Sequence, residues 1–420
     1  MVILAGCGVV ALLVWLGILL HPARPWDFHP VGEEEPLPPQ PAEWPAVCAL
    51  VPARNERETL PHTLPMLLTQ DYPGAFRVVV IDDRSQDGTA DVARRIAEQI
   101  GEVERLTVIT GAPLPSGWVG KVWALAQGAA SCKVQSMESE CRGQGQSKVK
   151  ILSPRYLLLT DADIRHAAGS LRRLVAESEA GQLALNSRMA RLRCVSGPER
   201  LLIPPFVFFF GLLYPRRWVN DRHSPVAAAA GGCVLLASTA LARIGGFASI
   251  KDKIIDDISL AQRVKSLSEP IRLTLSRGEV ESLRVYDSLW AIWRMVRRTA
   301  FTELRYSWVR LVGTVLGIML LFLLPPVLCL TGIGLTLTCV AGWPVAAGSW
   351  ALTLVLLGSC VWVIMALVYR PAVRFFGLSG LWSWTLPLAG VLYGAMTIDS
   401  ALQYVRGQRM GWRDHENACS

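Results

Sequence analysis

The sequence predicts a mixed α/β domain with a mostly parallel sheet, flanked by one N-terminal and several C-terminal transmembrane helices. Hydrophobic residues make up 51% of the 420 residues. This is too apolar for an ordinary soluble domain and too polar for a bundle of membrane helices alone. The longest apolar runs lie near the two ends of the chain. Between them, short β-branched segments alternate with helix-like segments, a pattern typical of a parallel sheet covered by helices.

The N-terminal segment, residues 1–22, is predicted to be a membrane helix because residues 2–20 are nearly all apolar and long enough to span a bilayer. A cleaved signal peptide is the alternative, but the segment lacks a basic start and a small-residue cleavage site. Arg24 is the first charged residue after the run, so the positive-inside rule places the following chain in the cytosol. Residues 23–45 are rich in Pro and Glu and are predicted to form an extended linker.

Residues 46–300 are predicted to form the α/β domain. The expected strands are Ala46–Val51, Phe76–Ile81, Arg105–Ile109 and Arg155–Thr160, and the expected helices include Asp87–Ile100 and Val119–Ala130. Residues 131–153 are polar and rich in Gln, Ser, Gly and Lys, so we expect a surface insertion with a composition that favours disorder. Residues 201–218 are strongly apolar but contain three prolines and end in two arginines. They are predicted to lie in the membrane interface, with a buried helix of the soluble domain as the alternative.

The C-terminal region, residues 301–405, is predicted to contain a membrane-entry helix and two or three transmembrane helices. The candidates are Leu311–Leu330, Ala351–Tyr369 and, more weakly, Leu381–Leu402. The loop at 369–380 and the polar tail at 406–420 both carry arginines, which favours the cytosol for both. Three C-terminal spans would put the tail outside. Either the last segment is re-entrant or interfacial, or the charge rule fails here.

Net charge and cysteine spacing restrict the function classes. The formal net charge of +8 suits a protein beside an anionic leaflet. Nucleic-acid binding is disfavoured because the basic residues are spread through the chain without interleaved aromatic residues. The ten cysteines show neither CxxC pairs nor zinc-ligand spacing, and several lie in apolar runs. We therefore expect all of them to be reduced, as in a domain facing the cytosol.

Four polar clusters follow predicted strands or open a predicted helix. They are residues 51–56 (VPARNE), residues 82–89 (DDRSQDGT), Gly120-Lys121 and Asp161-Ala162-Asp163. Ligands of parallel sheets gather at the carboxyl ends of the strands. Several carboxylates at one sheet edge are costly unless a cation or hydrogen-bond donors compensate them. Bound Mg²⁺ or Mn²⁺ would do so, held by Asp161 and Asp163 on the same side of a strand end together with substrate phosphates. A solvated loop or helix cap is the alternative for this pair.

The other polar residues each have two interpretations. Asp87 is predicted to form the turn that starts the following helix, which leaves Asp83 to bind a base or ribose. Lys121 is placed for phosphate at a helix N-terminus, or is a solvated surface lysine. Asp256 and Asp257 precede a helical run, so either they cap that helix or one of them is a general base for a hydroxyl acceptor.

The ordered motifs PARNE, VVVIDDRSQDGTA, GWVGK, LLLTDAD, AGGCVLL and IDD resemble those of family 2 glycosyltransferases. The fuller wording of GWVGKVWALAQG, ERLLIPPFVFFFGLLYPRRWVN and AAAAGGC looks like the bacterial hopene-associated glycosyltransferase branch. The resemblance covers roughly residues 47–306. It implies a GT-A fold, the Rossmann-like domain of nucleotide-diphospho-sugar transferases.

The resemblance also implies site residues. Glu56 and Asp83 would contact the nucleoside, with Asp82 beside them. Asp161 and Asp163 would hold the metal and the diphosphate. Asp257 would be the base of an inverting displacement, with Asp256 the next candidate. The remaining residues expected at the nucleotide-sugar are Arg54, Lys121 and Arg305.

Three departures from the family pattern limit the inference. Residues 302–306 (TELRY) stand where many processive relatives have Q-x-x-R-W, and only Arg305 is kept. Processive polymer synthesis is therefore disfavoured. The acidic pair is D-D where many relatives have E-D, and the insertion at 131–153 has no recognised counterpart.

The resemblance implies an enzyme that transfers a sugar from a nucleotide donor, expected to be UDP-linked, to a lipid acceptor, with a link to hopanoid metabolism. A polyprenyl phosphate, a glycerolipid or a ceramide-type lipid is the alternative acceptor, and an inactive scaffold is the non-enzyme alternative. The expected location is the bacterial cytoplasmic membrane, with several spans and a cytosolic catalytic domain. No nucleic-acid partner is expected.

Overall fold

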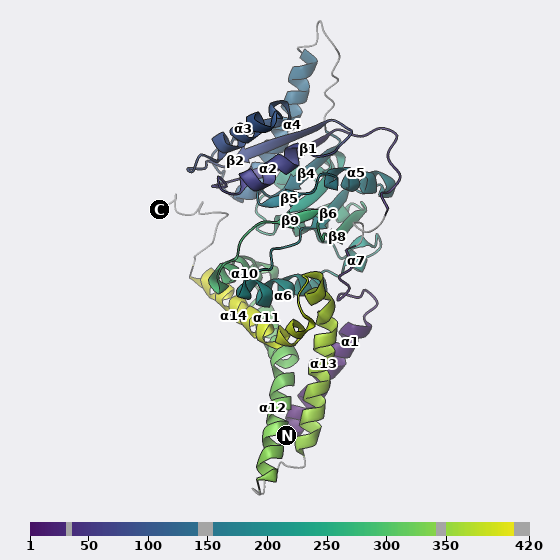
Figure 1. The fold of residues 1–420 in the computed structure, drawn as a ribbon, viewed down its shortest axis with the longest axis vertical. Coiled ribbons are helices and arrows are strands. Elements are labelled where there is room, and N and C mark those ends of the chain that lie inside the picture. Colours follow the sequence, from purple (N-terminus) through teal and green to yellow (C-terminus); the bar gives the residue numbers. More distant parts are fainter. Residues whose placement is uncertain (31–35, 142–153, 342–349, 407–420) are drawn as a thin grey trace. The chain divides into compact units, whose positions relative to one another are not determined.

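The computed structural model describes residues 1–30, 36–141, 154–341 and 350–406, and they form two compact units (Figure 1). Among the described residues, the helical unit contains 1–29, 194–217 and 286–406. The α/β unit contains residues 30–193 and 218–285. Each unit is therefore assembled from separate stretches of the chain. The predicted range 46–300 includes two stretches, 194–217 and 286–300, that pack with the helical unit.

The α/β unit has a seven-stranded sheet with the strand order β3-β2-β1-β4-β7-β6-β8. Neighbouring strands pair in parallel except β7, which is antiparallel to both β4 and β6. The predicted mostly parallel sheet is thus confirmed, and each of the four predicted strands forms. The strands of this sheet are β1 (Val47–Ala53), β2 (Phe76–Asp82), β3 (Leu106–Thr110), β4 (Tyr156–Thr160), β6 (Leu185–Met189), β7 (Cys233–Ala237) and β8 (Ile271–Leu275), and the two-stranded sheet pairs β5 (Ile164–His166) with β9 (Val280–Ser282).

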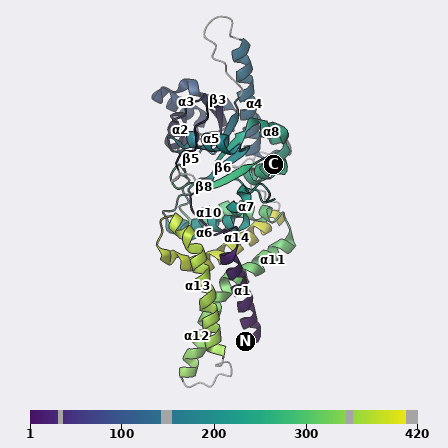
Figure 2. The same ribbon diagram turned by 90° about the vertical axis from the view of Figure 1, so that its right-hand side faces the viewer.

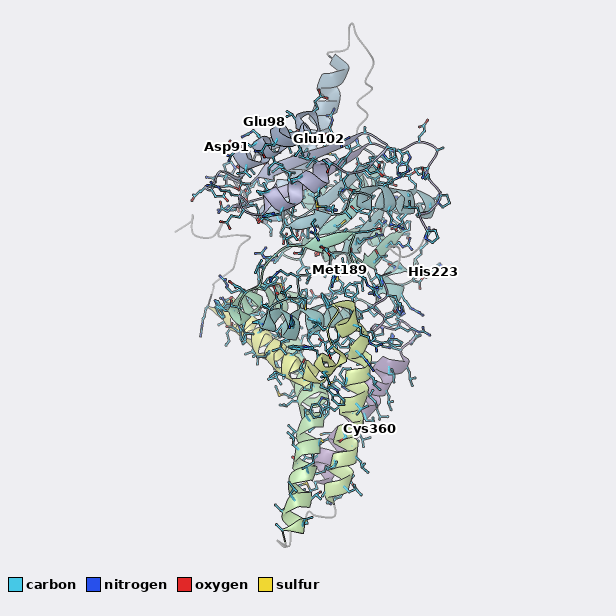
Figure 3. All side chains as sticks on the ribbon, viewed as in Figure 1. Asp91, Glu98, Glu102, Met189, His223 and Cys360 are labelled. Atoms are coloured by element: carbon cyan, nitrogen blue, oxygen red, sulfur yellow. A yellow bond between two sulfur atoms is a disulfide. The ribbon has the colours of Figure 1, made fainter. Side chains whose placement is uncertain are left out.

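The helices of the α/β unit bury one apolar face against the sheet. On α3, the residues Val92, Ala93, Ile96 and Ala97 are buried, as expected for a helix with one side on a sheet. Asp91 and Glu98 lie on its exposed side (Figure 3). The helices of this unit are α2 (Leu60–Leu68), α3 (Thr89–Ile100), α4 (Gly120–Cys141), α5 (Ser170–Gly181), α7 (Arg216–Asn220, which begins at the unit boundary), α8 (Ser238–Arg243) and α9 (Asp256–Ser266).

Two sequence predictions about α4 are wrong. Residues 131–141, predicted to belong to a polar insertion, continue α4 as helix, whereas residues 142–153 lie outside the described residues. In addition, Cys132 on α4 forms a disulfide with Cys48 on β1, with their Cα atoms 7.0 Å apart. The expectation that every cysteine is reduced therefore fails for this pair. The two residues are 84 positions apart and meet because α4 packs over β1. Their spacing in the sequence therefore could not predict the disulfide.

The helical unit contains four helices that are long and apolar enough to cross a membrane, within the residues that the structure describes. They are Val2–Leu20, Trp308–Val340, Ala351–Phe375 and Gly380–Val405. Figures 1 and 2 show α1, α12 and α13 running alongside one another. The helices of this unit are α1 (Val2–Leu20), α6 (Gly197–Leu213), α10 (Leu289–Glu303), α11 (Trp308–Ile318), α12 (Leu324–Val340), α13 (Ala351–Phe375) and α14 (Leu386–Val405), with a π-helical turn at Met319–Leu323 between α11 and α12.

The proline-containing segment predicted at 201–218 forms most of α6 and the start of α7. A capping box starts α6, because the Ser196 hydroxyl accepts the Glu199 amide while the Glu199 carboxylate accepts the Ser196 amide. Pro204 and Pro205 lie inside the helix and supply no amide donors. The Tyr393 hydroxyl on α14 donates to the Leu202 carbonyl, 2.7 Å away. This contact ties α6 into the helical unit.

Candidate active site

The first group of predicted site residues lies where β1 and β2 end. Ala53 and Asp82 are register partners at the ends of these parallel strands. The Asp83 amide donates to the Ala53 carbonyl over 2.8 Å. Arg54 forms an ion pair with the buried Asp83 carboxylate, with 3.5 Å between Nη1 and Oδ2. The structure thus brings together Arg54, Asp82 and Asp83.

Glu56 is fastened to the start of α3. It is buried, and its amide donates to the Thr89 hydroxyl over 2.9 Å. Asp87 accepts the Thr89 amide at 3.0 Å with one carboxylate oxygen and the Arg57 amide at 3.0 Å with the other. The prediction that Asp87 forms the turn before α3 is confirmed. Asp87 therefore accepts hydrogen bonds from backbone amides, whereas Asp83 pairs with the Arg54 side chain.

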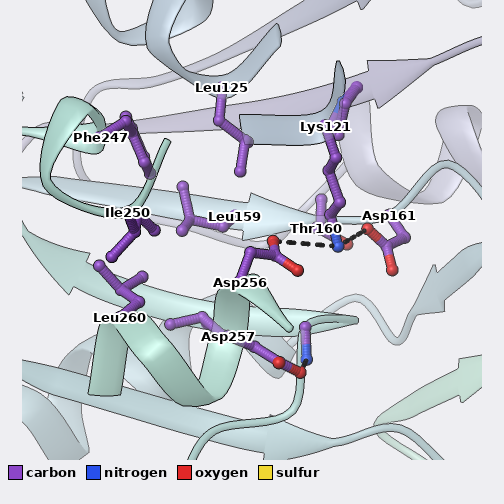
Figure 4. A pocket seen from close by; sticks show the side chains of 13 residues that line it. Lys121, Leu125, Leu159, Thr160, Asp161, Phe247, Ile250, Asp256, Asp257 and Leu260 are labelled. Carbon is purple, nitrogen blue, oxygen red and sulfur yellow. Dashed lines mark hydrogen bonds and ion pairs between the residues drawn. The ribbon is translucent and has the colours of Figure 1, made fainter. Parts of the chain in front are cut away.

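The second group lines a pocket at the same carboxyl edge of the sheet (Figure 4). Its polar side chains are Lys121, Thr160, Asp161, Asp256 and Asp257, and its apolar wall includes Leu125, Phe247, Ile250 and Leu260. These residues come from the start of α4, the end of β4, the start of α9 and the chain between α8 and α9. Residues as far apart in sequence as 121 and 257 thus share one small space.

Lys121 is the cation of this pocket. Its Nζ lies 2.7 Å from Asp161 Oδ1 and 3.6 Å from Asp256 Oδ2. Burial lowers the pKa of Lys121, but the two carboxylates outweigh it and hold the pKa above its ordinary value. Lys121 is therefore charged and paired, and its alternative interpretation as a solvated surface lysine is wrong.

Asp257 is held by two backbone donors. Its Oδ2 accepts the Gly231 amide at 2.7 Å and its Oδ1 accepts the Ile258 amide at 2.8 Å. Burial and the neighbouring Asp256 raise the pKa of Asp257 to about 7, although Lys121 and the two amides oppose the shift. A carboxylate with such a pKa can accept a proton near neutral pH.

Gly231 was not singled out as a residue from the sequence, although it lies in the motif AGGCVLL. A Cβ at this position would lie 3.1 Å from Lys121 Nζ and 3.2 Å from Asp257 Oδ2. Only a glycine lets the backbone amide approach the carboxylate this closely without moving its neighbours. The small residues of this motif were the only feature of the sequence that could have indicated a close approach of the backbone here.

Asp161 and Asp163 lie in a turn after β4, which ends at Thr160. The prediction that strand alternation places both carboxylates on the same side is therefore wrong, because the turn sets their directions. Asp161 faces Lys121, whereas Asp163 accepts the Ser282 hydroxyl of β9 at 3.1 Å. Burial, followed by the Asp161 charge, raises the pKa of Asp163, while Arg284 and Ser282 oppose this.

The donor set at Asp161 and Asp163 fits a hard divalent cation. Among the described residues, no group of three or more His, Cys, Asp or Glu side chains is arranged to hold a metal. Mg²⁺ and Mn²⁺ are commonly bound by one or two carboxylates plus substrate phosphates and water. Asp161 lines the pocket and Asp163 follows it in the same turn, so the pair would hold such a cation only if a bound ligand supplied further oxygens.

His166 supports the pocket from behind, and no sequence pattern identified it. The buried Thr160 hydroxyl donates to the Gly232 carbonyl at 2.9 Å and therefore accepts a hydrogen bond from His166 Nε2, 2.8 Å away. Burial lowers the pKa of His166 to about 4, so the ring is neutral at physiological pH. The network ties the end of β4 to the glycines before β7.

Arg305 is the one predicted site residue that belongs to the helical unit. It follows α10 with a φ of 52°, in the left-handed region, and its side chain is exposed. It is therefore not among the residues that the α/β unit itself brings together.

The seven-stranded sheet of mixed strand direction is typical of the GT-A fold. The chain belongs to glycosyl transferase family 21, whose family model matches residues 153–417, more than half of the sequence. The model of glycosyl transferase family 2 matches residues 48–224. These matches confirm the predicted fold and the predicted enzyme class at the level of the family.

Two solved structures are similar to this chain at low sequence identity. The mannosyltransferase PcManGT from Pyrobaculum calidifontis, in complex with GDP-Man and Mn²⁺, is 17% identical with a TM-score of 0.51, and the match covers 96% of this chain and 99% of that one. Glucosyl-3-phosphoglycerate synthase from Mycobacterium tuberculosis, with Mg²⁺ and uridine diphosphate, is 16% identical with a TM-score of 0.38, covering 62% and 79%. The first match extends over the helical unit as well as the α/β unit.

Proposed function

We propose that this glycosyltransferase moves one sugar from a nucleotide-sugar donor to the hydroxyl group of a membrane lipid, with inversion at the anomeric carbon and without processive synthesis. The single observation that carries the proposal is the pairing of Asp257, a fixed carboxylate with a pKa of about 7, with the Lys121–Asp161 ion pair in one pocket. A proton acceptor and a diphosphate-binding region are the two requirements of such a displacement.

In the proposed reaction, the acceptor oxygen forms a bond to the anomeric carbon while its proton passes to a carboxylate oxygen of Asp257. The bond between that carbon and the diphosphate oxygen breaks, and the nucleoside diphosphate leaves with the electron pair. The two backbone bonds fix the carboxylate, and each oxygen keeps a further lone pair for the proton. Asp256 is the second candidate base.

The donor would be held along the carboxyl edge of the sheet. Glu56, Asp82 and Asp83 are proposed to bind the nucleoside, with Arg54 positioning Asp83. Lys121 and Arg305 are proposed to face the diphosphate. A divalent cation bound by Asp161 and Asp163 would neutralise the diphosphate charge. The PcManGT structure contains GDP-Man and Mn²⁺, which supports a nucleotide-sugar with a metal, and we propose a UDP-sugar as donor.

A lipid acceptor is proposed because the catalytic unit shares its chain with helices that could cross a membrane, four of them within the described residues. The resemblance of residues 117–128, 199–220 and 227–233 to the hopene-associated branch favours a hopanoid or another polycyclic isoprenoid. A polyprenyl phosphate, a glycerolipid or a ceramide-type lipid is the alternative. The proposed location is the cytoplasmic membrane of a bacterium, with the catalytic unit in the cytosol.

The test is transfer of radiolabelled sugar to lipid by membranes containing Asp257→Asn. Asparagine keeps the shape but cannot accept the proton, so we expect transfer to fall by about 10²- to 10⁴-fold, while UDP-sugar binding measured by calorimetry is retained. Asp252→Asn is the matched control, since Asp252 is exposed on the loop before α9. Full transfer by Asp257→Asn would move the base to another residue.

The scaffold alternative makes a different prediction. A scaffold would show no metal-dependent binding of UDP-sugars and no change with Asp161→Asn combined with Asp163→Asn. The enzyme requires binding that depends on Mn²⁺ and weakens in this double variant. Lipid mass spectrometry of cells with and without the chain would then identify the acceptor.

A further inference from the structure

The last apolar helix, α14, differs from the other three candidate spans in how it is covered. In the apolar window of the span Gly380–Val405, which contains α14, 56% is buried inside the protein. The corresponding shares are 22% in α1, 28% in the helix Trp308–Val340 and 39% in α13. Figures 1 and 2 show α14 running obliquely to α12 and α13. Length and hydropathy alone therefore group together helices that have different surroundings.

The C-terminal half of α14 is fastened to α10. Asp399 accepts hydrogen bonds from Trp293 Nε1 at 2.7 Å and from Arg297 Nη1 at 3.3 Å. The Ser400 hydroxyl donates to the Arg297 carbonyl at 2.6 Å and accepts the Phe301 amide at 3.0 Å. The polar side of α14 thus faces α10.

The helix α10 is too polar for the hydrocarbon core. It carries three arginines within 15 residues, and Arg294 and Arg298 are exposed. Trp290 is 51% exposed, and its ring packs on the Arg297 guanidinium. Arginines together with exposed tryptophan are typical of a helix lying in the headgroup region. Because α10 and α14 are bonded together, the C-terminal half of α14 lies at the same depth.

The turn before the N-terminal end of α14 packs beside an arginine of α13. Gly380, which opens the turn before α14, lies against Arg370 of α13, such that a Cβ there would be 3.4 Å from Arg370 Nε. Arg370 and Arg374 belong to the last turns of α13, which the positive-inside rule assigns to the cytosolic side. Both ends of α14 therefore lie beside arginines of the helical unit.

An apolar stripe runs along α14 from the turn before it, and we define it as Trp384, Leu388, Val391, Ala395, Ile398, Leu402 and Val405. Val391 and Ala395 are half-buried, and the other five residues are exposed. These positions recur every three or four residues, the spacing of one helix face. Leu388 is 54% and Leu402 is 45% exposed. A helix whose polar side packs against protein and whose other side is apolar is suited to the boundary between lipid headgroups and acyl chains.

We propose that α14 lies along the cytosolic leaflet, with its apolar stripe in the acyl-chain boundary and the arginines of α10 at anionic headgroups. Of the candidate spans in the described part of the chain, α1, the helix Trp308–Val340 and α13 then cross the bilayer and α14 does not. Three crossings leave the loop after α13 and the C-terminal tail on one side, and every arginine-rich segment meets the positive-inside rule.

The test is a depth profile of spin labels in the full-length protein in anionic vesicles. Labels at Leu388→Cys, Ala395→Cys and Leu402→Cys are expected at equal depth. On α13, Leu352→Cys and Val363→Cys are the matched control, with Val363 the deeper. We expect the α14 labels to be shallower than Val363 by on the order of 5–10 Å. A maximum depth at Ala395, equal to that at Val363, would show a span and overturn the proposal.

A second measurement does not depend on labelled variants. Alkaline phosphatase and green fluorescent protein are fused after Leu378 or after Ser420 of the otherwise unchanged chain. The proposal requires both junctions on the same side of the membrane, with fluorescent GFP and inactive phosphatase at each. Opposite reporter patterns at the two junctions would contradict it, whatever the activity of the enzyme.

Discussion

Polar side chains are used differently in the two units. At the edge of the α/β sheet, Asp161, Asp256 and Asp257 gather around one lysine, so charges of one sign are crowded together. In the helical unit, polar groups such as those of Trp15, Tyr393 and Ser400 each satisfy a backbone group of a neighbouring helix. Several carboxylates close together destabilise the fold, and such clusters are retained where a ligand or a reaction uses them. Individual hydrogen bonds between helices, in contrast, hold the helices in position. The following predictions test this distinction.

The largest effect is expected at a charge cluster of the α/β unit that lies outside the pocket. Arg188 is fully buried, pairs with Glu177 at 2.7 Å and also contacts Glu279. Arg188→Leu leaves a buried carboxylate without its partner and should destabilise the unit by about 3–5 kcal/mol. Chemical denaturation measures this. Arg94→Leu is the control, because its pair with Asp91 is exposed, and it should change stability by less than about 1 kcal/mol.

A slightly smaller effect, on activity rather than stability, is expected at Lys121. Lys121→Met removes the cation between Asp161 and Asp256 and should lower transfer by roughly 100-fold. Because Lys121 lowers the pKa of Asp257, its loss should also shift the rise of activity with pH, expected to be centred near pH 7 in the unchanged protein, to higher pH. The pH profile of transfer checks this, and an unshifted profile would show that Lys121 does not act on Asp257.

The smallest effect is expected in the helical unit. Tyr393→Phe removes only the hydrogen bond to the Leu202 carbonyl, so stability should fall by about 1 kcal/mol, with kcat unchanged. Thermal unfolding in detergent and lipid-transfer kinetics measure the two quantities. A loss of kcat without a loss of stability would contradict the distinction between the two units.

The sequence predicted the parallel strands well because each is a short, continuous apolar run followed by polar residues. It also singled out Asp83, Asp161 and Asp257, since acidic residues at strand or helix ends are visible as local patterns. The structure places Asp161 and Asp257 in one pocket, and the roles of all three stay predictions. It could not predict contacts created by packing across the fold. The Cys48–Cys132 bond, the approach of Gly231 to Asp257 and the link from His166 through Thr160 to Gly232 depend on chain segments that meet only after folding. The helical continuation of α4 to Cys141 was missed because its composition is polar.

The single reversed strand of the sheet has a consequence for how the pocket can evolve. Since β7 runs opposite to β4, with Cys233 opposite Thr160, the chain enters β7 at the edge where β4 ends. A main-chain amide, that of Gly231, thereby reaches Asp257. No side-chain exchange except proline removes an amide hydrogen. Mutation can therefore vary the acidic residues and the pocket wall more readily than it can delete this donor, provided that position 231 stays small.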